Sequence, residues 1–220
     1  MTWASGLQVA PIGLRLAAAT SADALWLTNT GSDTLHAQVR VFRWTQADGK
    51  DLYDASRELL ASPPMVTIPA GGKQMVRVIR TSAPPDGVET AYRVIVDELP
   101  NDKHDGLNFV LRYSIPVFLA PKGDPAVAAT LHTEWITTPS GPVVRIRNDG
   151  RGHAQIAELS FTDTHGKRTV LVRGLVGYAL PGSTMSWPTP KDVPPAAGVL
   201  KARVNSEPAE STLVTGAGGG

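Results

Sequence analysis

The chain has 220 residues, a formal net charge of +1 at pH 7, and 42% hydrophobic residues. This length exceeds one β-sandwich and suits two domains of about 100 residues. The balanced charge predicts no nucleic-acid partner. The absence of cysteine excludes a disulfide framework, a thiolate metal site and a cysteine nucleophile. No apolar run reaches about 20 residues, so we expect no membrane insertion.

The two ends of the sequence carry little structural information. The start, "MTWASGLQVAP", lacks the basic and apolar regions of a secretory signal. Two interpretations stay open: a cytosolic protein, or one whose signal peptide has been removed. The final "TGAGGG" predicts a disordered end.

The predicted elements are short strands separated by 21 glycines and 18 prolines, a pattern typical of all-β proteins. The first, Leu7 to Leu16, is broken at Pro11 and Gly13, so we expect an edge strand that switches direction or sheet. A hairpin-like turn is expected at Asp48, Gly49 and Lys50, because an Asp-Gly pair is favoured where φ must be positive. The remaining predicted strands cover 24–31, 34–44, 65–80 (as two short strands), 90–100 and 107–121.

The stretch 107–121, "LNFVLRYSIPVFLAP", is the longest predicted strand. Its odd positions are all apolar or aromatic, a period of two that predicts one continuous apolar edge. Periodicity alone favours a buried core strand. We expect Pro116, which has no N–H, to break the ladder of this strand.

The second half of the chain repeats the first. Asn29 and Gly31 match Asn148 and Gly150, and the tripeptide His-Ala-Gln follows in both halves, at 36–38 and 153–155. Such an ordered repeat predicts two domains of related topology. We expect domains at 1–120 and 126–213, a short linker at 121–125 that holds them at a fixed angle with a cleft between them, and a disordered tail at 214–220.

Residues for catalysis do not converge in this sequence. No "GxSxG" elbow places a serine for triad chemistry. His132 and Glu134 share a strand face but lack a third ligand, so we expect no metal site and no other cofactor. Asp97 and Glu98 are adjacent and point to opposite faces of a strand, which is poor geometry for paired acid and base work. We therefore expect no enzyme.

Arginines interrupt three of the apolar strands, at Arg77, Arg93 and Arg112. One interpretation places each arginine on the solvent-facing side of a half-exposed sheet. The other places them on a cationic floor of a cleft, where a guanidinium group can bind a carboxylate through two hydrogen bonds. The sequence alone does not separate the two interpretations.

Three segments together resemble one protein family: "GGKQMVRVIR", "ETAYRVIVDELP" and "LRYSIPVFLAP". Over roughly residues 7 to 207 the chain resembles the periplasmic chaperones of the chaperone–usher pathway, which assemble pili and fimbriae. The "YR…ELP" and "RYSIPVF" patterns resemble the non-classical, archaic or sigma-type branch. The resemblance implies two immunoglobulin-like sandwich domains in a boomerang arrangement with an interdomain cleft.

The resemblance also implies how such a protein acts. In this family the strand called G1, here 107–119, completes an incomplete pilin fold by donor-strand complementation, and the chaperone delivers the subunit to an outer-membrane usher. When unloaded, family members protect the exposed strand by dimerising or with a mobile loop. The donor side chains would be Leu107, Phe109, Leu111, Tyr113 and Ile115.

The resemblance has one clear departure in its charged residues. Classical members anchor the carboxyl terminus of the subunit with an arginine and a lysine, and Gly13 and Pro116 occupy those positions here. Arg93 and Arg112 are the candidate replacements, with Arg15 as a weaker one. The interdomain ionic lock of the family would correspond to Arg77, Glu89 and Asp192.

The prediction is therefore a non-enzymatic periplasmic chaperone of pilin subunits. The alternative from another class is a two-domain sandwich adhesin or carbohydrate-binding module, in which the apolar row of G1 is ordinary core. Exposure of this row in the free protein separates the two interpretations.

Overall fold

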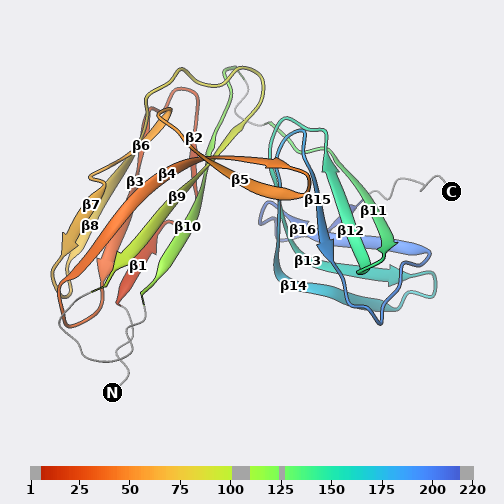
Figure 1. Cartoon of the computed structure of the whole chain (residues 1–220). Coiled ribbons are helices and arrows are strands. Elements are labelled where there is room, and N and C mark those ends of the chain that lie inside the picture. The colour runs from red at the N-terminus through yellow and green to blue at the C-terminus, as the bar shows by residue number, and fades with distance from the viewer. Residues whose placement is uncertain (1–5, 101–109, 124–126, 214–220) are drawn as a thin grey trace. The chain divides into compact units, whose positions relative to one another are not determined.

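The computed structural model describes residues 6–100, 110–123 and 127–213. Seventeen strands and no helix are found in these ranges (Figure 1). The all-β class predicted from the sequence is confirmed. In the same ranges no helix is long and apolar enough to cross a membrane.

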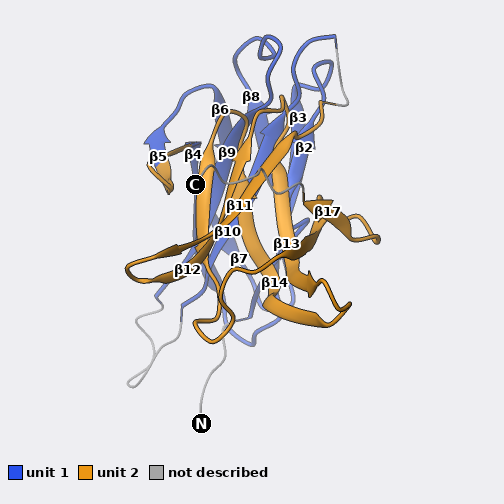
Figure 2. Ribbon diagram, turned by 90° about the vertical axis from the view of Figure 1, so that its right-hand side faces the viewer, with its two compact units in different colours: residues 1–45, 53–125 blue, residues 46–52, 126–220 orange. Residues whose placement is uncertain are grey.

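By internal packing the chain divides into two compact units (Figure 2). Unit 1 comprises Met1–Thr45 and Tyr53–Pro125, and unit 2 comprises Gln46–Leu52 and Ala126–Gly220. The domain limits expected from the sequence, 1–120 and 126–213, stay a prediction.

Unit 1 is built from two sheets, and the first has four strands. Its strand order is β1-β3-β8-β6, with β1 at Leu7–Ala10, β3 at Ala22–Asn29, β8 at Lys73–Arg80 and β6 at Leu59–Ser62. Neither β6 nor the neighbouring β5 was predicted. The six residues of β5 are all exposed, so this strand has no apolar period by which the sequence could reveal it.

The second sheet of unit 1 has six strands. Its order is β2-β10-β9-β4-β5, with β7 also paired to β4; the bounds are Leu14–Leu16 (β2), Arg112–Leu119 (β10), Thr90–Leu99 (β9), Leu35–Ala47 (β4), Lys50–Ala55 (β5) and Met65–Ile68 (β7). The tip of the β4–β5 hairpin, Gln46–Leu52, belongs to unit 2. Because β1 joins the first sheet and β2 the second, the expected switch at Pro11 and Gly13 is confirmed. Asp48 and Gly49 both have positive φ, as predicted for the tight turn between β4 and β5.

The core of unit 1 lies between its two sheets. Alternate side chains of each strand point inward, as Val94 and Val96 do on β9, while Arg93, Ile95 and Asp97 point to the opposite face. Leu25 and Leu27 on β3 are fully buried on the other side of the core. The period of two in the sequence therefore decides which face of each strand is covered.

Unit 2 contains a three-stranded and a four-stranded sheet, in the orders β11-β12-β15 and β14-β13-β16-β17. The strands are Leu131–Thr138 (β11), Gly141–Asn148 (β12), Thr184–Pro188 (β15), Arg168–Ala179 (β14), Ala154–Asp163 (β13), Gly198–Val204 (β16) and Ser211–Leu213 (β17). Val144, Ile146, Ile156 and Leu159 are fully buried in its core. Within this unit, the side-chain oxygen of Gln46 accepts a hydrogen bond from the backbone N–H of Leu180 at 2.8 Å.

Asn29, at the end of β3, is buried and makes three hydrogen bonds. Its Nδ2 donates to the carbonyl oxygens of Asp33 at 2.7 Å and Ile68 at 3.0 Å. Its Oδ1 accepts from the backbone N–H of Gly31 at 2.9 Å. One side chain thus satisfies three backbone groups where the chain turns between the two sheets.

Asn148, at the end of β12, makes the same three bonds in unit 2, and its Oδ1 accepts a fourth from Thr130 N at 3.1 Å. Its Nδ2 donates to the carbonyl oxygens of Gly152 at 2.8 Å and Ala179 at 3.0 Å, and its Oδ1 accepts from Gly150 N at 2.9 Å. The repeat seen in the sequence is therefore also a repeat of hydrogen bonds, with Asn148 in the place of Asn29.

Candidate functional site

Strand β10 has an open edge over part of its length. It pairs antiparallel with β9 from Arg112 to Leu119. On its other side it pairs in parallel with β2, but only over Val117–Leu119. Within the described ranges, Arg112–Pro116 therefore have a ladder neighbour on one side only. An edge of this kind is a template for an added strand.

The backbone groups on that edge follow from the alternation of an antiparallel ladder. Glu98 N donates to Leu111 O at 2.9 Å, so these two residues form a hydrogen-bonded pair. The next residues alternate, so Arg112, Ser114 and Pro116 direct their backbone groups away from β9. The open edge consequently offers both the N–H and the C=O of Arg112 and Ser114, whereas the C=O of Pro116 faces β2, where the parallel pairing of Val117 with Leu14 begins.

Pro116 does not break the β9–β10 ladder, contrary to the prediction. It lies opposite Arg93, and the register runs from Arg112 to Leu119 without a shift. The physical reason is its place in the alternation: the N–H that proline lacks would have pointed to the open edge, so no bond to β9 is lost.

The apolar row of β10 changes its environment along the strand. Leu111, just before β10, is 37% exposed, whereas Ile115 is 2% exposed and lies in the core of unit 1 with Val117. Tyr113 lies between these extremes, and its hydroxyl donates to Leu7 O at 2.7 Å. Leu107 and Phe109 lie outside the described residues. The core-strand interpretation therefore holds for the row from Ile115 onward.

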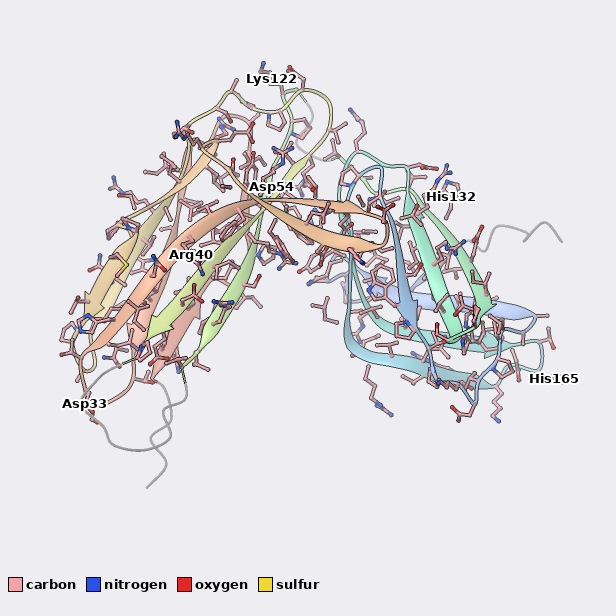
Figure 3. All side chains as sticks on the ribbon, viewed as in Figure 1. Asp33, Arg40, Asp54, Lys122, His132 and His165 are labelled. Carbon is pink, nitrogen blue, oxygen red and sulfur yellow. The ribbon has the colours of Figure 1, made fainter. Side chains whose placement is uncertain are left out.

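Arginines gather on the face of the six-stranded sheet that points away from the core. Arg112 Nε donates to Asp97 Oδ1. Arg40 Nη2, from β4, donates to Asp97 Oδ2 at 2.5 Å (Figure 3 labels Arg40). Burial raises the pKa of the Asp97 carboxyl, but the hydrogen bonds and charges of the two arginines outweigh burial and hold this pKa below its usual range.

Arg93 lies on the same face in a different contact. Its guanidinium carbon is 3.8 Å from the ring centroid of Trp44, a cation–π geometry. Its Nη1 is 3.4 Å from Ser114 O, at the open edge of β10. The planar guanidinium group is therefore oriented by the indole ring, next to the backbone that an added strand would contact.

The other charged candidates lie elsewhere. Arg77 is exposed on β8 of unit 1, and Asp192 is exposed in unit 2, between β15 and β16. Glu89 is buried in unit 1, and its Oε2 is 3.9 Å from Arg15 Nη2. A Cβ on Gly13 would be 3.7 Å from Pro116 Cγ, so the two classical anchor positions are neighbours here and neither carries a charge.

The two candidate metal ligands of unit 2 each contact a neighbouring charged side chain. His132 Nε2 is 3.2 Å from Asp149 Oδ2, and Arg145 Nη1 donates to Glu134 Oε2 at 3.3 Å. His132 is labelled in Figure 3. In the described part of the chain no group of three or more histidine, aspartate or glutamate side chains is placed to hold a metal.

Sequence reasoning missed two features of this site. Arg40 was not singled out, although it alternates with the apolar residues of "QVRVF", as Arg93 and Arg112 do in their strands. Asp97 and Glu98 were considered only as an acid–base pair. Their contacts with the start of β10 come from strand pairing, which no local pattern reveals.

Comparisons with known proteins agree with this architecture. Residues 6–124 match the family model of the pili and flagellar-assembly chaperones, PapD N-terminal domain. The chain therefore belongs to this family. A comparison with curated proteins found no match.

Three solved structures illustrate the similarity. The chaperone in the CsuC–CsuE chaperone–tip adhesion subunit complex, from archaic chaperone–usher Csu pili of Acinetobacter baumannii, is 28% identical, with a TM-score of 0.76 over 95% of this chain and 98% of that one. The Salmonella enterica SafA pilin–SafB chaperone complex (18%, TM-score 0.70, 97% and 99%) and the YadV chaperone (16%, TM-score 0.69, 94% and 100%) share the fold. The resemblance drawn from the sequence is confirmed. Chaperones of this family are periplasmic and are not enzymes.

Proposed function

We propose that this chain is a periplasmic, non-enzymatic chaperone that holds a pilin subunit on the open edge of β10 and delivers it to an outer-membrane usher. The family match supports this function over the adhesin or carbohydrate-binding alternative. The observation that carries it is the edge Arg112–Pro116, which is paired on one side only in the described structure and follows the exposed Leu111. No cofactor takes part in this binding.

The proposed binding combines backbone and side-chain contacts. An incoming strand would pair with Arg112 and Ser114, while alternate apolar side chains enter pockets of the subunit. The proposed donor side chains are Leu107, Phe109 and Leu111, with Tyr113 and Ile115 continuing the row into unit 1. Burying a large apolar side chain contributes roughly 1.5–3 kcal/mol, so three of them suffice for stable holding.

The charged residues have separate proposed roles. Arg93, with Arg112, would bind the terminal carboxylate of the subunit. Arg77, Glu89 and Asp192 remain the proposed interdomain lock. We also propose that the unloaded chaperone protects its edge by forming a dimer, because an exposed apolar edge invites pairing.

The test is co-expression of the chaperone with a pilin-like subunit, followed by affinity recovery of the complex. The triple variant Leu107→Ser, Phe109→Ser, Leu111→Ser should lose subunit recovery and remain folded by circular dichroism. A matched triple serine variant at Val170, Leu175 and Val199, exposed apolar residues of unit 2, should retain recovery. Normal recovery with the first variant would reject the proposed function.

A further inference from the structure

Two adjacent carboxylates on β9 both contact the first residues of the donor edge. We propose that Asp97 and Glu98 are positioning residues that hold the start of β10 in a single register on β9. This inference rests on the proposed function, because register matters to a subunit only if β10 is the strand that it binds.

The apolar row of β10 cannot select this register by itself. Its side chains alternate with a period of two, so a slip by one residue would move them all to the wrong face. A slip by two residues restores an apolar side chain to each inward position, for example with Val117 where Ile115 had been. The row therefore excludes odd slips much more strongly than even ones. Another contact must distinguish the native register from its two-residue neighbours.

Asp97 supplies a contact of that kind. It lies directly opposite Arg112 in the ladder, and only 9% of the residue is exposed. Arg40 holds the second oxygen of the same carboxylate from the far side, on β4. After a two-residue slip, Asp97 would lie opposite Ser114 or outside the strand, and the nearly buried carboxylate would lose its partner from β10. Arg40 would still hold one carboxylate oxygen, but the other would lose its charged partner in a nearly buried place, so the slipped state is penalised.

Glu98 marks the same register through the backbone. Its own N–H donates to Leu111 O at 2.9 Å, and its carboxylate Oε2 accepts from Leu111 N at 3.0 Å. Both backbone groups of Leu111 are thus bound by one residue of β9. The ladder is extended by one residue beyond Arg112, where the exposed part of the apolar row begins.

The two contacts have one consequence for binding. Leu111 and Arg112 are held at a defined height on the sheet, so the donor side chains reach an incoming strand in one alignment. A slipped edge would offer each subunit pocket the neighbouring side chain of the row. Asp97 and Glu98 would therefore determine which donor side chain meets each pocket of the subunit, without contacting the subunit themselves.

The test uses disulfides as reporters of register, because the natural chain has no cysteine. Ser114 lies opposite Ile95, in a pair whose side chains are close. Ile95→Cys with Ser114→Cys should therefore cross-link in the native register. Ile95→Cys with Pro116→Cys should cross-link only after a two-residue slip. Both pairs lie on the face away from the core, so they do not alter it.

Each cysteine pair is then combined with Asp97→Ala and Glu98→Ala. In these alanine variants we expect the slipped cross-link to rise several-fold relative to the native one. Glu98→Gln keeps an acceptor oxygen, so replacing Glu98→Ala by Glu98→Gln should restore the native ratio. Glu210→Gln, which removes an ion pair with Arg168 in unit 2, is the control and should leave the ratio of slipped to native cross-link unchanged. If the double alanine variant does not fold, Glu98→Ala alone is measured, and a smaller rise in the same direction is expected.

An unchanged ratio in the folded variants would overturn the inference. This result would leave the proposed function intact, because the triple serine variant tests that separately by subunit recovery. Conversely, normal recovery with the triple serine variant would reject the proposed function, while the cross-linking ratio would still report whether Asp97 and Glu98 set the register.

Discussion

At the scale of single residues, the basic face shows how one side-chain type is held in two ways. Arg112 is 68% exposed at its side chain and is already paired with Asp97, whereas Arg93 is stacked on Trp44. A stacked guanidinium group is oriented before a ligand arrives, so less side-chain entropy is lost on binding. Arg93 is therefore the better placed of the two proposed carboxylate anchors.

This difference predicts unequal effects of substitution. Arg93→Ala should weaken subunit binding by about 2–5 kcal/mol, the usual cost of removing one partner of a buried, hydrogen-bonded charge pair. Arg112→Ala should weaken it less, and Arg93→Lys should recover only part of the loss because lysine lacks the planar fork. The measurement is the partition of a labelled subunit between wild-type and variant chaperones. Equal partition with Arg93→Ala would exclude the anchor role.

At the scale of elements, β10 combines a closed side and an open side. The side that faces β9 is fully paired through Pro116, and β2 covers the other side only at Val117–Leu119. Because antiparallel pairs alternate, the same strand can lose an N–H on its open side without loosening its own sheet. The chain itself shows this tolerance at Pro116.

A second proline on the open side should separate binding from folding. Ser114→Pro removes an N–H that points away from β9, so unit 1 should keep most of its stability while the complex loses one inter-strand hydrogen bond. Tyr113→Pro, one residue earlier, should instead disrupt the β9 ladder. Thermal unfolding and subunit recovery, measured for both variants, distinguish these outcomes. Full recovery with Ser114→Pro would show that the incoming strand does not pair at this position.

At the scale of the whole molecule, both units contain the same corner, a turn between two strands whose backbone groups are hydrogen-bonded by one buried asparagine. Asn29 and Asn148 satisfy the same three backbone groups between consecutive strands, and Asn148 also accepts from Thr130 N. The three shared bonds have nearly the same lengths in the two units, so the two residues should contribute similarly to the stability of their units.

Asn29→Ala and Asn148→Ala should therefore each destabilise the unit that carries the substitution. Each change leaves buried backbone groups without a partner, at about 1–3 kcal/mol for a buried group left unsatisfied. Hydrogen exchange, read separately for peptides of unit 1 and unit 2, measures the two effects. If either variant exchanged at the wild-type rate throughout its unit, the corner would not have the stabilising role inferred here.

The sequence by itself determined the all-β class, the switch at Pro11 and Gly13, the turn at Asp48 and Gly49, and the paired corner asparagines. Each is encoded locally, by alternation, by turn-forming residues or by a repeated motif, so no distant contact was needed to read it. The family resemblance was also visible in short segments of sequence.

Only the tertiary structure decided which strand edge is open and which charges meet. The pairing of β10 with β2 and β9, the tolerance of Pro116, and the cluster of Arg40, Asp97 and Arg112 all depend on residues far apart in the chain. The alternation of apolar and polar residues predicts which side chains share a face of a strand. It does not predict which other strand lies beside that strand. The partners of an exposed strand are set by the packing of the whole sheet.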